Sequence, residues 1–193
     1  MLRCFDGPTT MTQTIPSSRR WTYADYCRIP ADRKRHQIVD GRHFVSPAPS
    51  LRHQEVALRL AMELVRAVED QRRGRVFVAP VDVHLAPGTI VQPDLVVLST
   101  RHTSRLGQKK ITGAPDLLVE ILSPSHRTLD TVRKRERYER AGVRELWLVD
   151  PDNDSVVQLV LRRGRYVEVA TDGSLVRLRA LRGITVDLRA VFA

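Results

Sequence analysis

Two acidic side chains stand in stretches that are otherwise apolar. Glu120 lies inside the run "LLVEIL", and Asp94 follows a proline and opens the run "LVVLS". An unpaired carboxylate in an apolar strand costs several kcal/mol or loses its charge through a pKa shift, so each acid needs a cation or strong donors. Two acids on neighbouring strands can share a divalent cation, because Mg²⁺ takes one or two protein carboxylates and fills its remaining positions with water and phosphate oxygen. A structural ion pair with one of the many arginines is the alternative interpretation of Glu120.

A lysine further along the chain could complete this chemistry. Asp130, Lys134 and Tyr138 recur at intervals of four residues, so on a helix they share one face. Tyr138 and Ala141 indicate that this face packs against a sheet, which would direct Lys134 towards the acids. Its ammonium group would then hold a water molecule or a phosphate beside a metal ion. The alternative is a solvated helix lysine paired with Asp130, which is the commoner fate of such a residue.

Short apolar runs bounded by turn residues predict the strands that must position these side chains. "HQIVDGRHFV" is typical of a hairpin around the Asp40-Gly41 turn. "RVFVAP", "VDVHLA" and "QPDLVVLS" are three further predicted strands, and Pro87-Gly88 is the predicted turn between the last two. "PDLLVEILS" is the strand that carries Glu120.

Two helices are predicted beside these strands. The first runs from Leu51 to about Arg72 with Ser50 as its cap, because its apolar residues recur every four positions: Val56, Leu60, Leu64 and Val68. The second begins after Ser125 or Thr128, runs to about Ala141 and ends at Gly142. It lies between the Glu120 strand and the strand "VRELWLVD", which predicts a βαβ crossover with parallel strands.

The remaining segments complete a prediction of one domain. "SVVQLVLRRGRYVEVA", "SLVRL" and "GITVDL" predict an antiparallel meander with a turn at Arg163-Gly164. Residues 1–20 have few apolar side chains and no sustained period, so we expect a flexible tail there and a single domain over residues 21–193. The expected fold class is α/β, with a mixed central β-sheet flanked by helices.

Composition narrows the class of protein. Among 193 residues, 42% are hydrophobic and 28% charged, which excludes a largely disordered chain. The formal net charge of +10 favours a polyanionic partner such as nucleic acid, although arginine-rich surfaces also follow from genomic base composition. Cys4 and Cys27 have no metal-type spacing, and no apolar run reaches the roughly 20 residues needed to span a bilayer. We therefore expect a cytoplasmic protein without a membrane partner.

These motifs together resemble those of a known family. A hairpin, a Pro-Asp strand, the segment "VEILSPS", Asp-x-x-x-Lys-x-x-x-Tyr and "YERAGVRELWLVDP" are similar to the Uma-two family, within the PD-(D/E)XK superfamily of restriction-endonuclease-like folds. The resemblance runs from about Trp21 to the carboxyl end. It implies a restriction-endonuclease-like fold and an Mg²⁺- or Mn²⁺-dependent endonuclease that acts on DNA.

The resemblance also implies roles for individual residues. Asp94 and Glu120 would bind the metal, with the Ile121 carbonyl as a further ligand. The superfamily's lysine usually stands two residues after the acid, where this chain has Leu122, so the catalytic lysine would be Lys134 on the helix. Asp130 and Tyr138 on the same helix face are possible accessory residues.

Two further accessory residues lie earlier in the chain. His53 matches the family's helix entry in "APSLRHQ", although a histidine that bonds only its own turn is an equal alternative. Gln37 stands where the family commonly has an acid. An amide brings no charge, so this departure leaves open a catalytically inactive module that binds nucleic acid or a protein on the same fold.

The expected partner is DNA. Metal and lysine would share the hydrolysis of the phosphodiester bond, and the surface segments "VRKRERYER" and "RHTSRLGQKK" would hold the backbone without reading its sequence. A homodimer is expected, because cutting both strands commonly uses two sites related by a two-fold axis. A purely structural ion network around Glu120 is a third alternative.

Overall fold

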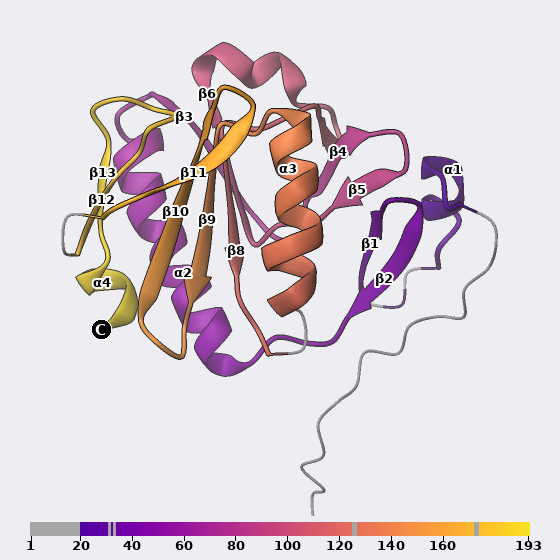
Figure 1. Cartoon of the computed structure of the whole chain (residues 1–193), viewed down its shortest axis with the longest axis horizontal. Helices are drawn as coiled ribbons and strands as arrows, with labels where there is room; N and C mark the ends of the chain where they lie inside the picture. Colours follow the sequence, from indigo (N-terminus) through magenta and orange to yellow (C-terminus); the bar gives the residue numbers. More distant parts are fainter. Residues whose placement is uncertain (1–19, 31, 33, 125–126, 172–173) are drawn as a thin grey trace, which may run out of the picture.

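The structure, a computed structural model, describes residues 20–30, 32, 34–124, 127–171 and 174–193 (Figure 1). Within these ranges the largest sheet has six strands in the order β11-β10-β9-β8-β6-β3. β8 and β9 are parallel, and the other neighbours are antiparallel, so the predicted mixed sheet and α/β class are confirmed. The strands are β3 Gly74–Val78, β6 Leu95–Ser99, β8 Leu117–Ile121, β9 Glu145–Asp150, β10 Ser155–Arg162 and β11 Arg165–Val169.

A second sheet of five strands carries the predicted hairpin. Its order is β2-β1-β5-β4-β7, and β1 and β2 meet at the Asp40-Gly41 turn, where both residues have positive φ. The strands are β1 Arg35–Val39, β2 Arg42–Ser46, β4 Asp82–Ala86, β5 Thr89–Val91 and β7 Lys110–Thr112. The predicted connection at Pro87-Gly88 was wrong, because this turn joins β4 to the short β5 and not to the strand that follows Asp94.

The predicted carboxyl-terminal meander is only partly correct. β10 and β11 are antiparallel across the Arg163-Gly164 turn, as expected. β12 Leu175–Arg177 and β13 Thr185–Asp187 instead pair with each other in a separate two-stranded sheet. The short helix α4 Arg189–Phe192 follows and packs against α2. Local apolar alternation predicted these strands, but it could not specify which strands they pair with.

The first long helix matches its prediction closely. α2 spans Leu51–Leu64 and continues through the wider π-helical turns of Val65–Glu69, ending a few residues before the predicted Arg72. The Ser50 hydroxyl caps it by accepting a hydrogen bond from the His53 backbone N–H at 3.2 Å. The apolar positions that predicted the helix are all buried: Val56, Leu60, Leu64 and Val68.

The second helix forms the predicted crossover between the parallel strands β8 and β9. It includes the π-helical segment Leu129–Lys134 and α3 Arg135–Ala141, and Gly142 ends it with a φ of 83°. Thr128 already has helical φ and ψ, and its side chain makes no capping hydrogen bond, so the prediction of Thr128 as the cap was wrong. The other predicted cap, Ser125, lies outside the described residues.

The side on which each β8 residue lies explains the orientation of the predicted acid. Leu117 and Val119 join a core that contains α2, whereas Leu118 and Leu122 join a core on the side of α3. Successive strand residues face opposite sides of a sheet. Glu120 alternates with Leu118 and Leu122, so it points towards the crossover helix.

The amino-terminal region is described from Arg20 onwards. The short helix α1 Tyr23–Tyr26 begins with a capping box formed by Thr22 and Asp25, and a short 3₁₀ helix covers Thr100–Arg105. The predicted tail over residues 1–20 therefore falls, apart from Arg20, outside the described residues. No helix in the described ranges is both long and apolar enough to cross a lipid bilayer.

Candidate metal and catalytic site

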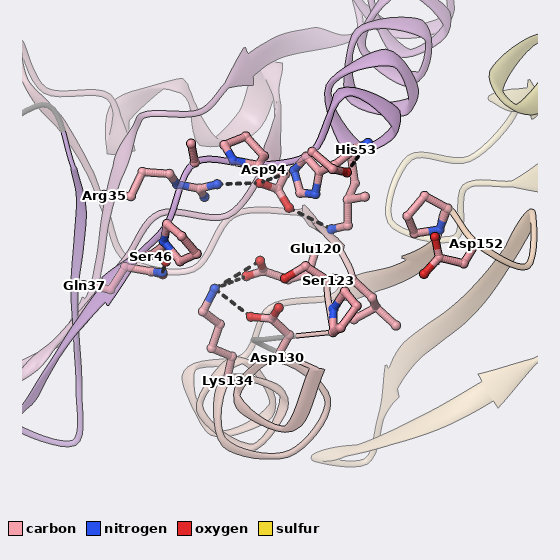
Figure 2. Close-up of a pocket in the computed structure, with 18 residues that line it drawn as sticks. Arg35, Gln37, Ser46, His53, Asp94, Glu120, Ser123, Asp130, Lys134 and Asp152 are labelled. Atoms are coloured by element: carbon pink, nitrogen blue, oxygen red, sulfur yellow. Dashed lines mark hydrogen bonds and ion pairs between the residues drawn. The ribbon is translucent and has the colours of Figure 1, made fainter. Parts of the chain in front are cut away.

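A cavity of about 240 Å³ collects the predicted site residues from distant parts of the chain (Figure 2). It lies between the β1–β2 hairpin, the start of α2, the carboxyl end of β8 and the crossover helix. All predicted site residues except Tyr138 line it: Gln37, His53, Asp94, Glu120, Ile121, Asp130 and Lys134. The fold therefore brings together side chains that the sequence places on five separate segments.

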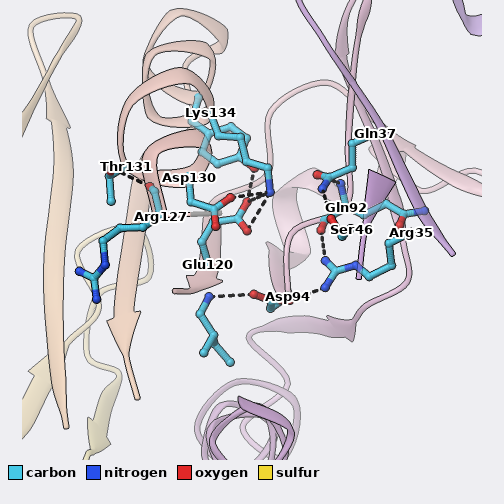
Figure 3. Close-up of polar contacts among 12 residues, drawn as sticks. Arg35, Gln37, Ser46, Gln92, Asp94, Glu120, Arg127, Asp130, Thr131 and Lys134 are labelled. Carbon is cyan, nitrogen blue, oxygen red and sulfur yellow. Dashed lines mark hydrogen bonds and ion pairs between the residues drawn. The ribbon is translucent and has the colours of Figure 1, made fainter. Parts of the chain in front are cut away.

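Asp94 lies directly before β6 and is 5% exposed. Its Oδ2 accepts a hydrogen bond from the Ile121 backbone N–H at 2.8 Å, and its Oδ1 lies 2.8 Å from Arg35 Nη1 (Figure 3). Burial acts to raise the pKa of Asp94, but His53, Arg35 and the Ile121 N–H outweigh it and lower the pKa to about 2. Asp94 is therefore an ionised carboxylate joined to the end of β8.

Glu120 is 2% exposed, and two residues of the crossover helix bind its carboxylate. Both of its carboxylate oxygens lie 3.1 Å from Lys134 Nζ, and the Tyr138 hydroxyl donates a hydrogen bond to Oε1. Burial raises the pKa of Glu120 to about 8; Lys134 opposes this rise, whereas Asp130 and Asp94 add to it. The neighbouring negative charges thus make this pocket a place where an added cation is stabilised.

Lys134 is buried between two acids. Its Nζ lies 2.9 Å from Asp130 Oδ1, at ion-pair distance but without hydrogen-bond alignment, in addition to its contacts with Glu120. Burial lowers the pKa of Lys134, but Asp130 and Glu120 more than compensate and hold it above its ordinary value. The alternative of a solvated lysine was wrong, because the side chain pairs with Asp130 but is only 2% exposed.

Gln37 lies on β1 and is 1% exposed. Its Oε1 accepts a hydrogen bond from the Gln92 backbone N–H at 3.0 Å, and its Nε2 lies 3.5 Å from the Ser46 hydroxyl. The amide thus ties the hairpin to the segment that leads into Asp94. In this structure Gln37 supports the position of an acid rather than supplying a charge.

His53 bonds its own turn and also faces the site, so the alternative that it bonds only its own turn was wrong. Its backbone N–H binds the Ser50 hydroxyl of its own turn. Its ring also faces the site, because Nε2 lies 3.4 Å from Asp94 Oδ1. His53 Nδ1 is buried and has no hydrogen-bond partner in the described ranges.

Arg35 is a site residue that the sequence analysis missed. Besides contacting Asp94, its guanidinium donates a hydrogen bond to the Gln92 carbonyl oxygen. A signal was present, because Arg35 and Gln37 are two residues apart on one strand and must face the same side. Arg35 brings a second cation to the pocket that holds Lys134 (Figure 3).

The donor set determines which metal the pocket suits. The described residues include no cluster of three or more His, Cys, Asp or Glu side chains arranged to hold a metal. Three buried carboxylates line the cavity, and Asp130 is paired with Lys134. The other two, Asp94 and Glu120, fit Mg²⁺ or Mn²⁺ because such ions need few protein ligands and prefer oxygen. Burial is the main cause of the raised pKa of Glu120, and the negative charges of Asp130 and Asp94 add to it, which supports this fit. A bound ion would have to share these carboxylates with Arg35 and Lys134.

Comparisons with known proteins bear on the family and the fold of the chain. A family model described as "Putative restriction endonuclease" matches residues 23–189. A solved structure described as "a putative nuclease belonging to DUF820" from Anabaena variabilis has a TM-score of 0.73 and 19% sequence identity, and covers 89% of this chain and 97% of that chain. At this identity the structural match shows the fold alone. No curated protein matches the chain.

Proposed function

The chain belongs to the Uma2 family of restriction-endonuclease-like proteins, and on that premise we propose that it is a metal-dependent endonuclease that hydrolyses phosphodiester bonds in DNA. One observation carries the proposal. The two buried acids and the buried lysine, which lie far apart in the sequence, line a single cavity. Buried charge is costly unless it is paired or used, and perturbed acids in a cleft are typical of functional sites.

The acids would hold the ion. Asp94 is ionised and can bind the ion directly. The ionised form of Glu120 is disfavoured in the metal-free site, so Glu120 would release its proton when a cation binds. The Ile121 carbonyl is the third proposed ligand. When bound, Mg²⁺ or Mn²⁺ supplies Lewis-acid activation of the scissile phosphate and of a water molecule.

Lys134 would act on the reacting phosphate. It is protonated, and the acids on either side hold its Nζ in place at the cavity wall. A fixed ammonium group there can orient the attacking water and stabilise the negative charge that develops in the transition state. Tyr138 and Asp130 would be positioning residues, because both contact the Glu120–Lys134 pair.

The residues near Asp94 would tune the same site. His53 and Arg35 both contact Asp94 Oδ1, so either can hold the acid or turn towards a phosphate. Gln37 would fix the segment that carries Asp94. We further propose a cytoplasmic homodimer, since two sites are needed to cut both strands of a duplex in one encounter.

A second candidate function is an inactive nucleic-acid-binding module on the same fold. The observation that favours it is the ion pair between Arg35 and Asp94, which places a protein cation at 2.8 Å from a proposed metal ligand. Together with the uncharged Gln37, this pairing is the arrangement expected if binding of a metal had been lost.

A plasmid-nicking assay separates the two. Supercoiled DNA would be incubated with Mg²⁺ or Mn²⁺ and wild-type protein, Asp94→Asn, Glu120→Gln, or the control Glu168→Gln, which removes an exposed acid from β11. The endonuclease proposal expects nicking by the wild type and the control, and a loss of about 100-fold or more in the two site variants. Nicking that survives in both site variants would refute the assignment, whereas a folded wild type that never nicks would favour the binding module.

A further inference from the structure

A second and larger cavity, of about 1070 Å³, lies between α3, the β1–β2 turn and the β4–β5 turn. Five arginines line it, and we call it the arginine groove: Arg20, Arg42, Arg133, Arg137 and Arg140. Among its described lining residues Asp40 is the one acid. A concave surface lined by charges of one sign concentrates its field, so this groove attracts anions.

Little of this charge is neutralised within the groove. Asp40 forms an ion pair with Arg137. Arg140 Nη2 lies 3.9 Å from Glu136 Oε2 in a mostly exposed pair, which contributes little. In the described ranges Arg42 and Arg133 have no acid within ion-pair distance, and both are exposed. The groove thus keeps several guanidinium groups available to a ligand.

The helix that carries these arginines also lines the candidate active site. Arg133, Arg137 and Arg140 recur at intervals of four and three residues, so they share one face, while Lys134 and Tyr138 occupy the neighbouring face. At about 1.5 Å of rise per residue, Arg137 lies about 4.5 Å and Arg140 about 9 Å along the helix from Lys134. One helix therefore places its lysine in the smaller cavity and its arginines in the larger one.

The β1–β2 hairpin, like the crossover helix, runs from the smaller cavity to the arginine groove. Gln37 and Ser46 line the smaller cavity, and Asp40 and Arg42 line the groove. The separation along β1 from Gln37 to Asp40 is three residues, or about 10 Å at the rise of a strand. Helix and hairpin both lead from the active-site cavity into the groove within about 10 Å.

We propose that the arginine groove is the track for the phosphodiester backbone of the nucleic-acid strand that enters the candidate active site. A nucleic-acid backbone presents phosphate anions repeatedly at short spacing. One guanidinium group can bind two oxygens of a phosphate through two parallel N–H donors. The identity of the strand as the substrate rests on the proposed endonuclease function. The groove reads no bases, so its contribution is sequence-independent and sensitive to salt.

The test measures binding without cleavage. Fluorescence anisotropy in EDTA would follow labelled single-stranded and duplex DNA across a KCl series with the wild type, with the groove variant Arg42→Gln/Arg133→Gln/Arg140→Gln, and with a control. The control, Arg72→Gln/Arg162→Gln/Arg182→Gln, removes the same charge from exposed arginines outside both cavities. Thermal unfolding of each protein checks that it is folded, and the single change Arg133→Glu replaces the groove variant if that variant is not.

The groove variant should bind at least tenfold more weakly, and the slope of log affinity against log salt should fall by about 2, because each lost contact to a single strand removes roughly 0.7. The control should keep the wild-type slope, and the DNA form with the larger loss identifies the strand that the groove holds. Equal losses in the two triple variants would overturn the inference, even if wild-type protein nicks plasmid. Groove-dependent binding by a wild type that never nicks would instead refute the endonuclease function and leave the groove assigned.

Discussion

Gln37 Oε1 accepts a hydrogen bond from the backbone N–H of Gln92 at 3.0 Å. Gln92 stands two residues before Asp94, and its carbonyl oxygen accepts from Arg35 on the same strand as Gln37. Two side chains of β1 therefore hold both backbone polar groups of the residue that leads into the acid. The glutamine that departs from the family's usual acid has a positioning contact in this chain.

The first prediction separates the support given by Gln37 from its missing charge. Gln37→Leu removes the acceptor of a buried N–H, which should lower the free energy of unfolding by about 1–3 kcal/mol in urea denaturation. Gln37→Glu keeps an acceptor oxygen and adds a negative charge to the cavity, so it should bind Mn²⁺ more tightly than the wild type. Equal stability of Gln37→Leu and wild type would show that the Gln92 contact is unimportant.

Arg35 gives a second prediction, because it competes with any metal for Asp94 Oδ1. Arg35→Gln should lower the Mn²⁺ concentration at half-saturation by roughly threefold to tenfold, since loss of a competing ion pair is worth on the order of 1 kcal/mol. Arg35→Lys keeps the charge and serves as the matched control. Weaker metal binding by Arg35→Gln would mean that Arg35 mainly orients Asp94.

Lys134 is predicted to contribute to the chemical step more than to metal binding. Lys134→Met should slow single-turnover nicking by about 100-fold or more, because it removes a cation aimed at the developing charge. Metal affinity should stay equal or increase, since the acids lose a competing cation. Lys34→Met, a change at an exposed lysine outside the site cavity, is the control. A parallel loss of metal affinity and rate would contradict this division of roles.

The raised pKa of Glu120 predicts how stability changes with pH in metal-free protein. Its folded-state pKa of about 8 lies above the ordinary value of 4.5, so the native state binds this proton more tightly than the unfolded state. The stabilisation is complete below the ordinary pKa and is lost as the pH rises towards the folded-state pKa. Glu120→Gln should therefore unfold at a higher temperature than the wild type near pH 8 in EDTA.

Thermal unfolding of both proteins at about pH 5 and about pH 8 tests this prediction, and the advantage of the variant should shrink at the lower pH. A Glu120→Gln variant that is less stable than the wild type near pH 8 would show that the bonds from Lys134 and Tyr138 outweigh the burial of charge.

Local patterns in the sequence predicted the elements that carry the site. Apolar runs predicted the Glu120 strand and the crossover to β9, and four-residue periodicity predicted both α2 and the burial of Lys134 beside Tyr138. These features were accessible because each depends on neighbours within about two helical turns.

Features that depend on pairing between distant segments of the chain could not be predicted from the sequence. The assembly of β1, β4, β5 and β7 into a second sheet is set by partners far apart in the chain, and so is the separation of β12 and β13 from the meander. Arg35 was missed for the same reason, because its role follows from the approach of the hairpin to Asp94. The two-residue spacing between Arg35 and Gln37 is visible in the sequence. It does not distinguish Arg35 from the many other arginines of the chain.

The most direct test of the central claim is calorimetric titration of Mg²⁺ and Mn²⁺ into the purified protein and into its Asp94→Asn/Glu120→Gln double variant. If these acids form the metal site, the wild type binds one or both ions saturably, and the folded double variant shows no saturable heat. Equal binding by both proteins, or no binding by a well-folded wild type, would contradict the claim that Asp94 and Glu120 hold a catalytic metal.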